Sequence, residues 1–578
     1  NQRIRTESML ELKKKLASSL AEAAAKAFSE NAPGEDEIAA MLEYPPDDTL
    51  GDIALPCFKL SKTLRQAPPK IASALAEASQ GIPGFDRIAA DGGYLNFKVS
   101  GEYLVSNVLK NAIDTGESYG KNEIGKGKTV ILDYASPNVA KPFHIGHLGT
   151  TVIGHSLKLI HQFSGYNCIG INHLGDWGTQ FGKLICAFRL WGSREEIEKG
   201  GIDALVALYV KFHAEAEKDG TLNDQARAES KKLEEHDEEN IAIWKWFIEI
   251  SFREYEITYK QLGITFDSYK GESFYTDKMP EQIEKMREMN LLKIDDGASI
   301  VDLSEYGMPP CLILRRDGST LYPTRDIAAA VYRKRTYNFD KCIYVTSAGQ
   351  NLHFAQWFKV VELMGYDWYN ELVHVPYGTV SINGGKLATR TGNVVLLRDL
   401  FAQAIEKVQA VIDEKNPGLE NRDEVAEAVG VGAVVFHYLY NSRIKDINFV
   451  MESALSFDGA TGPYAQYTYA RTCSILGKAD ADMNAEAVIT SPEEARLLLT
   501  VSKFPERVIQ ALNAYEPSMI TRYIIELCTA FNRFYQACPI ITAESKSVKN
   551  TRLQITKAAQ NALGNALHLI CLKTPEKI

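Results

Sequence analysis

Residues 129–171 read TVILDYASPNVAKPFHIGHLGTTVIGHSLKLIHQFSGYNCIGI, and this stretch decides the fold. Its opening run, 129–134, is almost continuously apolar, which suits a strand buried in a parallel sheet. A loop that contains prolines follows, and residues 148–163 then have the pattern of a helix with Gly165 at its C-terminal end. Residues 167–171 have the pattern of a second short strand. Strand, loop, helix and strand begin a doubly wound α/β sheet, which binds ligands at the carboxyl ends of its strands, where this loop falls.

The chain on either side of this stretch divides into a smaller mixed part and a long helical part. Apolar residues recur at helical spacing over 9–30, and residues 94–99 alternate like a strand. Residues 190–260 are highly charged and have a helical pattern, as in a solvated helical insert. We expect three domains: an α+β domain over 9–112, an α/β domain over 125–400 with a helical insert at about 190–260, and an all-α part over 401–578.

The composition is that of an ordinary globular protein, with 45% hydrophobic and 24% charged residues among 578. The sequence contains no run of about 18 apolar residues, which is the length that a membrane-spanning helix needs. Residues 1–8 lack the apolar core of a secretory signal. The nine cysteines include no C-x-x-C pair and no metal-ligand spacing, which indicates reduced core cysteines in a cytoplasmic protein. A net charge of −10 argues mildly against a protein that coats nucleic acid by charge alone, although local basic strips could still bind RNA.

The strongest local signal is the loop 136–147. His144 and His147 are three residues apart at the start of a helix, so they share one face. A helix N-terminus has free N–H groups and a positive partial charge that suit phosphate, and Gly146 allows a nucleotide to approach closely. With Lys141, the two imidazoles could bind a triphosphate and stabilise the charge of departing pyrophosphate. A structural histidine pair or half of a metal site fits the two residues as well, and the strand, loop and helix around them favour the nucleotide.

Residues 144–147, His-Ile-Gly-His, match the HIGH signature of class I aminoacyl-tRNA synthetases. The thirteen residues 136–148, Ser-Pro-Asn-Val-Ala-Lys-Pro-Phe-His-Ile-Gly-His-Leu, resemble the form found in arginyl-tRNA synthetases, and so long a match is far more specific. Residues 173–182, His-Leu-Gly-Asp-Trp-Gly-Thr-Gln-Phe-Gly, are similar to the same family. The resemblance covers nearly the whole chain from Met9, and the charged insert is its least specific part.

This resemblance implies a Rossmann-like α/β catalytic domain of the HIGH-type nucleotidyl transferases. The N-terminal α+β domain would touch the outer corner of the tRNA, and the C-terminal all-α helical bundle would contain a stem and the anticodon-binding domain. The resemblance further implies a cytoplasmic monomer that binds tRNA(Arg), L-arginine and ATP with Mg²⁺, without a membrane and without a dedicated protein metal site. Within the second matching run, it implies nucleotide contacts from Gly175 and Asp176.

Class I enzymes have a second signature, KMSKS, on a mobile loop whose lysines hold the ATP phosphates. The resemblance places its counterpart at 384–392, Gly-Gly-Lys-Leu-Ala-Thr-Arg-Thr-Gly, where Lys386 stands for the first lysine and no lysine occupies the end. In the family a lysine just upstream of HIGH compensates for such a loop, and Lys141 occupies that position. The resemblance thus assigns Lys386, Thr389 and Arg390 to ATP, although a glycine turn with two basic residues also fits a surface hairpin.

A substrate arginine requires a carboxylate for its guanidinium, ideally in a bidentate pair. Residues 322–326, Tyr-Pro-Thr-Arg-Asp, resemble the family's Tyr-x-Thr-Arg-Asp element, in which Asp326 would be the main partner and Tyr322 would shape the pocket. The remaining arginine contacts that the resemblance implies are Asp133, Asn138 and Gln350. Taken singly, each of these residues also fits a structural role such as a helix cap or a local ion pair.

Residues 462–471, Gly-Pro-Tyr-Ala-Gln-Tyr-Thr-Tyr-Ala-Arg, resemble the start of the family's anticodon-binding domain. Tyrosines and an arginine on one helix can stack on unpaired bases and reach phosphates. The resemblance implies tRNA contacts from Tyr464, Gln466, Tyr467 and Arg471, while tyrosines that pack in a helical core remain the alternative.

The reaction that the resemblance implies is that of an arginine–tRNA ligase. The arginine carboxylate attacks the α-phosphate of ATP, and the 2′-hydroxyl of the terminal tRNA adenosine then attacks the arginyl-adenylate, without a covalent protein nucleophile. The catalytic groups would be His144, His147, Lys141, Lys386 and Arg390. Three alternatives stay open: a small-molecule adenylyltransferase, a non-catalytic tRNA-binding paralogue, and a class I synthetase for another amino acid.

Overall fold

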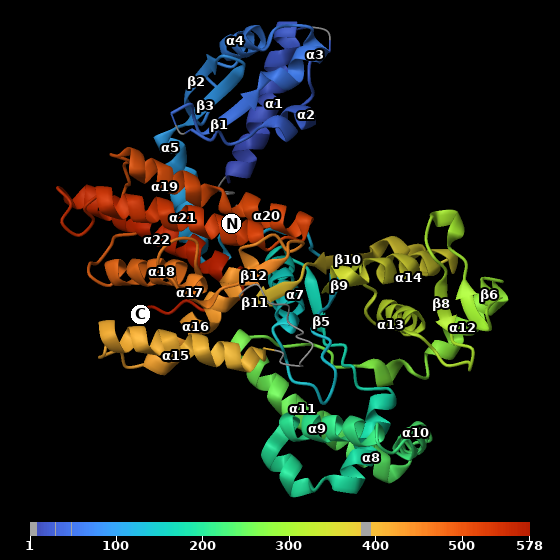
Figure 1. Cartoon of the computed structure of the whole chain (residues 1–578). Coiled ribbons are helices and arrows are strands. Elements are labelled where there is room, and N and C mark those ends of the chain that lie inside the picture. The colour runs from blue at the N-terminus through green and yellow to red at the C-terminus, as the bar shows by residue number, and fades with distance from the viewer. Residues whose placement is uncertain (1–7, 29–30, 48, 383–394) are drawn as a thin grey trace.

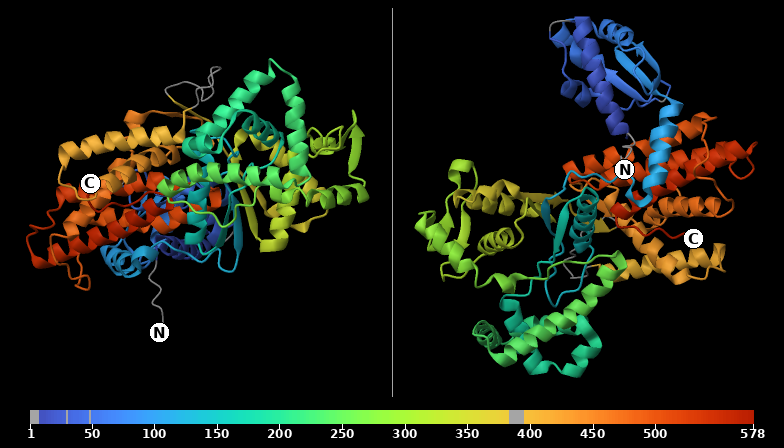
Figure 2. Two further views of the ribbon diagram at one scale, coloured as in Figure 1. Left: turned by 90° about the horizontal axis from the view of Figure 1, so that it is seen from below. Right: turned by 180° about the vertical axis from the view of Figure 1, so that it is seen from behind.

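The computed structural model describes residues 8–28, 31–47, 49–382 and 395–578. In Figure 1 the N-terminal part stands at the top, on a helical C-terminal part that lies beside a small central sheet. Two lobes extend from the sheet, one below it and one to its right. The view from behind in Figure 2 shows the same separation, and the two lobes and the C-terminal part meet at the sheet.

The N-terminal part is an antiparallel sheet covered by helices. Its strands are β1 Ile53–Pro56, β2 Phe85–Asp91 and β3 Tyr94–Val99, in the order β1-β3-β2. Its helices are α1 Met9–Phe28, α2 Glu35–Met41, α3 Ser61–Leu64 and α4 Pro68–Ala78. Leu12, Leu16 and Leu20 follow one face of α1 and are all buried, which confirms the helix and the α+β fold expected from the spacing.

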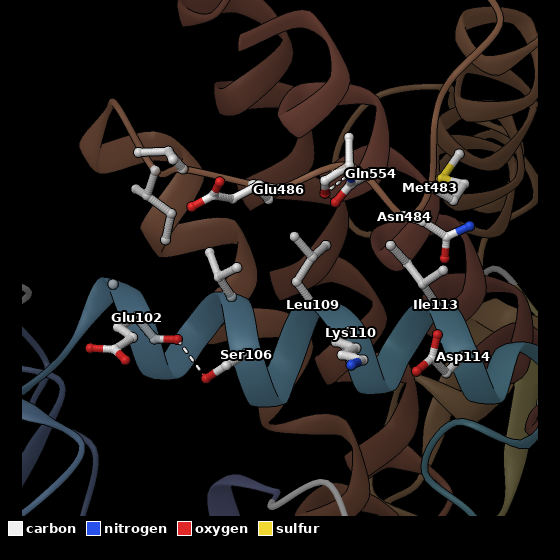
Figure 3. Close-up of a pocket in the computed structure, with 16 residues that line it drawn as sticks. Glu102, Ser106, Leu109, Lys110, Ile113, Asp114, Met483, Asn484, Glu486 and Gln554 are labelled. Atoms are coloured by element: carbon white, nitrogen blue, oxygen red, sulfur yellow. Dashed lines mark hydrogen bonds between the residues drawn. The ribbon is translucent and has the colours of Figure 1, made fainter. Parts of the chain in front are cut away.

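A continuous helical segment joins this part to the rest of the chain: α5 Gly101–Tyr103, a π-helical turn Leu104–Leu109 and α6 Lys110–Thr115. A pocket of about 590 Å³ lies between this segment and residues 483–489. Leu109 and Ile113 point from the helix toward the opposite wall, where Gln554 lies (Figure 3). None of the described residues that the sequence assigns to the active site lines this pocket.

The central sheet is entirely parallel. Its strands are β4 Thr129–Asp133, β5 Asn167–Ile171, β9 Lys341–Ser347 and β10 Leu372–Tyr377, in the order β10-β9-β4-β5. The connecting helices are α7 Gly146–Phe163, from β4 to β5, and α14 Asn351–Leu363, from β9 to β10. Because β4 pairs with β5 on one side and with β9 on the other, the strand order reverses between β4 and β9. Ligands of doubly wound sheets bind outside the carboxyl ends of the strands at this reversal, so the expected fold class is confirmed.

Both lobes are inserted between β5 and β9. The lobe below the sheet is built of α8 Thr179–Trp191, α9 Arg194–Ala216, α10 Thr221–Glu234 and α11 Glu238–Leu262. The lobe to the right combines an antiparallel sheet with two helices: β6 Leu292–Asp295, β7 Ala298–Val301, β8 Cys311–Leu314, α12 Met279–Glu288 and α13 Tyr322–Tyr337. The charged stretch at 190–260 is therefore helical, as its pattern predicts.

The C-terminal part is helical except for one short strand pair. Its helices are α15 Leu397–Lys415, α16 Arg422–Leu439, α17 Met451–Ala454, α18 Gly462–Leu476, α19 Pro492–Ser502, α20 Phe504–Ala514, α21 Ser518–Ala537 and α22 Lys546–Leu569. The strands β11 Val380–Ile382 and β12 Ile447–Phe449 pair in parallel. Ser491 and Glu494 form a capping box at the start of α19, which fixes this helix end.

One hydrophobic core runs through the N-terminal part, the central sheet and the C-terminal helices, and it includes Leu16, Leu132 and Leu553. The lower lobe has a separate core around Phe181 and Phe247. The C-terminal helices are thus packed directly on the sheet, whereas the lower lobe is a more independent unit. Within the described part of the chain, no helix is both long and apolar enough to cross a membrane.

His161 on α7 provides a test of this packing. Its ring is fully buried against Tyr166 and Tyr515, and burial lowers its pKa to about 4. An unfolded histidine has a pKa of about 6.5, so acid protonates this residue in the unfolded chain before it does so in the folded one. Protonation stabilises the unfolded chain, and the free energy of unfolding therefore falls as pH drops from about 6.5 to about 4. We expect His161→Gln to reduce the loss of unfolding free energy between pH 8 and pH 5 by about 2 kcal/mol. Urea denaturation at both pH values measures this, and equal losses in both proteins would contradict it.

Candidate active site

The loop between β4 and α7 has an unusual backbone that a neighbouring segment holds in place. Ala135 and Ala140 both have left-handed backbone angles, with φ of 66° and 63°, which are strained for residues with a side chain. Between them the loop pairs with the segment after β5, since Val139 N donates to Gly175 O at 3.1 Å and Gly175 N donates to Pro137 O at 3.0 Å. A Cβ on Gly175 would lie 2.3 Å from Oδ1 of Asn138, so only glycine permits this approach.

The same loop rests on α11 from the lower lobe. The Tyr255 hydroxyl lies 2.7 Å from the carbonyl oxygen of Asn138 and 2.6 Å from that of Lys141. Ser251 Oγ accepts a hydrogen bond from Ala140 N at 2.9 Å. The inserted helix therefore fixes the backbone that presents the exposed side chain of Lys141.

The two HIGH histidines lie side by side at the N-terminus of α7, with ring centroids 3.9 Å apart and ring planes tilted by 44°. His144 N donates to Nδ1 of His147 at 3.1 Å, and Gly146 N donates to Nδ1 of His144 at 3.0 Å. Burial is the main cause that lowers the pKa of His147 to about 4, and the neighbouring His144 adds to it. Burial also lowers the pKa of His144, and the charge of Lys141 adds to this effect. Both rings are consequently neutral at pH 7. Because each Nδ1 accepts a hydrogen bond, each Nε2 holds the proton and can donate it to an anion.

The segment that follows the expected KMSKS counterpart also reaches the HIGH loop. Ile145 N donates to Val395 O at 3.0 Å, and Leu397 N donates to Phe143 O at 3.0 Å. Residues Lys386, Thr389 and Arg390 lie outside the described residues. The chain that leaves this region nevertheless pairs with the HIGH segment itself.

Strand β4 of the parallel sheet ends at Asp133, which forms a buried ion pair. Asp133 Oδ2 accepts a hydrogen bond from Nη1 of Arg333 at 2.7 Å, and Nη2 of Arg333 lies 3.3 Å from Nδ1 of His173. Only 1% of the Arg333 side chain is exposed, and Asp133 raises the pKa of this guanidinium against the effect of burial. Asp133, which the sequence assigns to substrate arginine, is therefore already held by an arginine of the protein.

The other expected arginine contacts lie at the starts of α13 and α14 and on the loop after β4. Asp326 Oδ2 lies 2.6 Å from Nε2 of His353. Tyr322, at the first turn of α13, is 65% exposed, and Gln350 at the start of α14 is exposed as well. Asn138 is exposed on the loop after β4. Tyr322, Gln350 and Asn138 thus present exposed side chains to solvent.

His173 lies at the centre of a group of charged side chains. Burial lowers its pKa, and Asp133, Asp176 and Asp326 all act on the ring with Arg333. Burial also raises the pKa of nearby Glu272 to about 7 against the effect of Arg325, whose guanidinium lies 3.2 Å away. The structure thus gathers carboxylates from distant segments in one place, which suits a cationic ligand.

Asp176 has a different environment from the one that the sequence suggests. Its carboxylate accepts hydrogen bonds from Ser273 N at 2.8 Å and Ser273 Oγ at 2.6 Å, and only 6% of the residue is exposed. The carboxylate therefore orders the loop beside the site, and its contact with a nucleotide stays a prediction.

Sequence reasoning missed Arg333, His173 and Glu272 as site residues. A signal existed for Arg333, because it lies seven residues after Asp326 and thus two turns along the same face of α13. The others are placed by contacts between distant segments and have no comparable local signal.

The C-terminal residues assigned to tRNA separate into exposed and buried ones. The Arg471 guanidinium lies 5.1 Å from the ring centroids of both Tyr467 and Tyr535, and both tyrosines are 42% exposed. Gln466 is fully buried, and its Nε2 donates to carbonyl oxygens inside the helical bundle at 2.9 and 3.1 Å. The expectation that Gln466 contacts RNA is therefore corrected: it braces the bundle. Tyr464 is half-buried and bonds to a neighbouring helix.

Family models match three regions of the chain. The model for the class I (R) tRNA synthetase catalytic domain matches residues 107–451, the DALR anticodon binding domain matches 465–578, and the arginyl tRNA synthetase N-terminal domain matches 11–99. The sheet with its HIGH helix is thus the catalytic fold of a class I aminoacyl-tRNA synthetase.

Individual relatives agree on the specificity. Arginine–tRNA ligases of Alkaliphilus metalliredigens and Clostridioides difficile are both 50% identical to the chain, over 94% of it and 97% and 96% of their own lengths. The arginyl-tRNA synthetase structures of Thermus thermophilus and Plasmodium falciparum are 24% identical, with TM-scores of 0.81 and 0.82. They cover 97% and 98% of this chain, which covers 100% and 99% of theirs, and they show the shared fold. The chain belongs to the arginyl-tRNA synthetase family.

The buried pair of Asp133 and Arg333 generates a prediction about stability. Removal of one partner from a buried ion pair leaves an uncompensated charge, which costs about 3–5 kcal/mol. We expect Arg333→Met to lower the free energy of unfolding by about that amount and Arg333→Met/Asp133→Asn to recover much of it. Chemical denaturation of both single variants and the double variant measures the coupling. Additive losses would show that the two side chains do not depend on each other.

Proposed function

We propose that the chain activates L-arginine with ATP and transfers it to tRNA(Arg), with the release of AMP and diphosphate. One observation carries this proposal. The HIGH segment and the cluster of carboxylates around His173 lie on either side of the point between β4 and β9 where the strand order reverses. On one side, neutral His144 and His147 and the cation Lys141 surround a helix N-terminus. On the other, Asp326 and the residues around His173 provide negative charge. An anionic nucleotide and a cationic amino acid can thus meet in one crevice.

The nucleotide side acts through position and charge. Lys141 and the Nε2–H groups of His144 and His147 bind phosphate oxygens and stabilise the charge that develops as pyrophosphate leaves. Gly146 keeps the helix N-terminus open to the phosphates. Gly175 shapes the nucleotide side by holding the loop, and we assign Asp176 a role through the same segment. From the family pattern, Lys386, Thr389 and Arg390 complete the phosphate contacts.

Magnesium enters this proposal with ATP. Among the described residues, no three His, Cys, Asp or Glu side chains form a group that could hold a metal ion. A Mg²⁺ ion bound through the phosphates needs few protein ligands, since it keeps much of its water shell.

The amino-acid side distinguishes arginine by charge and shape. Asp326 pairs with the substrate guanidinium, and His353 orients this carboxylate through the 2.6 Å contact. Tyr322 and Gln350 form the exposed walls of the pocket. Arg333 holds one oxygen of Asp133, so the other oxygen is directed to the substrate's ammonium group, next to the amide of Asn138.

The remaining parts serve the tRNA. We assign residues 9–112 to contact with the outer corner of the tRNA, 125–400 to catalysis and 401–578 to the stem and anticodon binding. Tyr464, Tyr467 and Arg471 form the expected RNA surface, to which the structure adds Tyr535 beside Arg471. The enzyme acts as a cytoplasmic monomer in this proposal.

ATP–pyrophosphate exchange with each of the twenty amino acids, with and without tRNA, tests the reaction. Exchange with arginine alone, in the presence of tRNA, supports the proposal. Exchange with another amino acid would keep the class and reject the pocket, and no exchange by the folded protein would favour a tRNA-binding paralogue.

Asp326 provides the test of amino-acid recognition. Asp326→Asn keeps the size of the side chain and removes its charge, so we expect the KM for arginine to rise about 10- to 100-fold. The KM for ATP should change little. Asp317→Asn, which neutralises an exposed turn carboxylate close by in the chain, is the matched control. An unchanged KM for arginine in Asp326→Asn would remove Asp326 from the pocket.

The exposed tyrosines provide the test of RNA binding. Stacking of a base on an aromatic ring contributes about 1–3 kcal/mol, so we expect Tyr467→Ala to raise the KM for tRNA about 5- to 100-fold. The KM for arginine should stay the same. Tyr306→Ala is the matched control. Tyr306 is 45% exposed and has the ammonium group of Lys359 over its ring, and it lies in a different lobe. Equal effects of the two substitutions would argue against this surface.

A further inference from the structure

A second cavity, of about 550 Å³, lies between the start of α11 and the segments after β5. It is lined by the indoles of Trp177 and Trp244, by Lys245 and His236 on the lower lobe, and by Ser273 and Thr276 opposite. The roles assigned above to ATP, arginine and the anticodon use none of these six side chains.

The two tryptophans form a fixed aromatic corner. Their ring centroids lie 5.7 Å apart with the planes at 90°, and Trp244 Nε1 donates to the carbonyl oxygen of Asp176 at 2.8 Å. Both rings are half-buried, so each packs on the protein at one side and borders the cavity at another. A flat aromatic or heterocyclic group fits such a corner by stacking.

The charged groups at the rim are mixed, and one cation is available. Lys245 and His236 are exposed, and Glu238 also lines the cavity. Among the residues that the structure describes, Lys245 has no ion-pair partner. A ligand with a flat base and a phosphate would therefore find a stacking surface and an unpaired ammonium group.

The cavity borders the chain segment that holds the HIGH loop. Ser273, on its wall, donates both hydrogen bonds to Asp176, and Trp177 directly follows that residue. Gly175 on the other side pairs with the loop that leads into HIGH. Residues 175–177 therefore contact the HIGH loop at one end and border the cavity at the other.

We propose that this cavity binds an unpaired base of the tRNA 3′ end, stacked in the corner of Trp177 and Trp244, with Lys245 at a neighbouring phosphate. This inference rests on the proposed function, because it needs a tRNA whose 3′ end reaches the site. ATP is the poorer occupant, since its triphosphate requires the several donors that Lys141 and the helix N-terminus provide at HIGH. Stacking on indoles with little base-edge hydrogen bonding suits single-stranded RNA.

The decisive experiment compares the affinities of intact tRNA(Arg) and of the same tRNA lacking its unpaired 3′ nucleotides. We expect Trp244→Ala to weaken binding of intact tRNA about 5- to 100-fold and to leave binding of the truncated tRNA nearly unchanged. Trp244→Phe keeps an aromatic ring, so it should lose less affinity for intact tRNA than Trp244→Ala. Trp191→Ala is the matched control, since Trp191 is a half-buried indole that packs on the same core of the lower lobe away from the cavity. It should affect neither tRNA.

Lys245→Gln gives an independent measurement at an exposed position that does not affect folding. This substitution should weaken the binding of intact tRNA severalfold and reduce the salt dependence of that binding by about one counterion. The binding of truncated tRNA should not change. Equal losses for intact and truncated tRNA, or no loss for intact tRNA in both variants, would overturn the proposal. Failure of the wild-type protein to charge tRNA with arginine would instead reject the proposed function, so the two failures are distinguishable.

Discussion

A guanidinium and a carboxylate 2.7 Å apart, almost closed off from solvent, join the end of the first parallel strand to α13. The rest of the site depends on this contact between Arg333 and Asp133. It fixes the rotation of α13 about its axis, and the same helix holds Tyr322 and Asp326 at its start. Because an unpaired buried charge is costly, few other positions of α13 are possible. The side chains at the start of α13 are therefore positioned by a buried arginine farther along the same helix.

The HIGH loop is held with comparable rigidity from two directions. Gly175 pairs with it on one side, and Tyr255 and Ser251 of α11 hold it on the other. These contacts maintain left-handed angles at two alanines that would otherwise relax. Since α11 also begins at the tryptophan cavity, one helix contacts both the phosphate-binding loop and the surface proposed for the tRNA 3′ end.

The C-terminal helices are packed on the catalytic sheet. Ser156 of α7 donates to the carbonyl oxygen of Leu569 at the end of α22 at 2.6 Å, so the HIGH helix touches the C-terminal bundle directly. The N-terminal part is joined to α20 by the ion pair of Lys13 and Glu506 at 2.9 Å. A continuous apolar core covers these junctions. This packing fixes the distance between the exposed tyrosines and the HIGH helix.

The sequence by itself determined the parallel strands, the HIGH helix and the amphipathic N-terminal helix, because each depends on residues within a few positions of one another. It also determined the family, through runs such as 136–148. Only the tertiary structure decided which partner each polar group takes. Asp133 meets Arg333 200 residues away, Asp176 meets Ser273 97 residues away, and Gln466 bonds to a carbonyl 107 residues away and not to RNA. Such pairings arise when the folded chain brings distant segments together, and no local spacing records them.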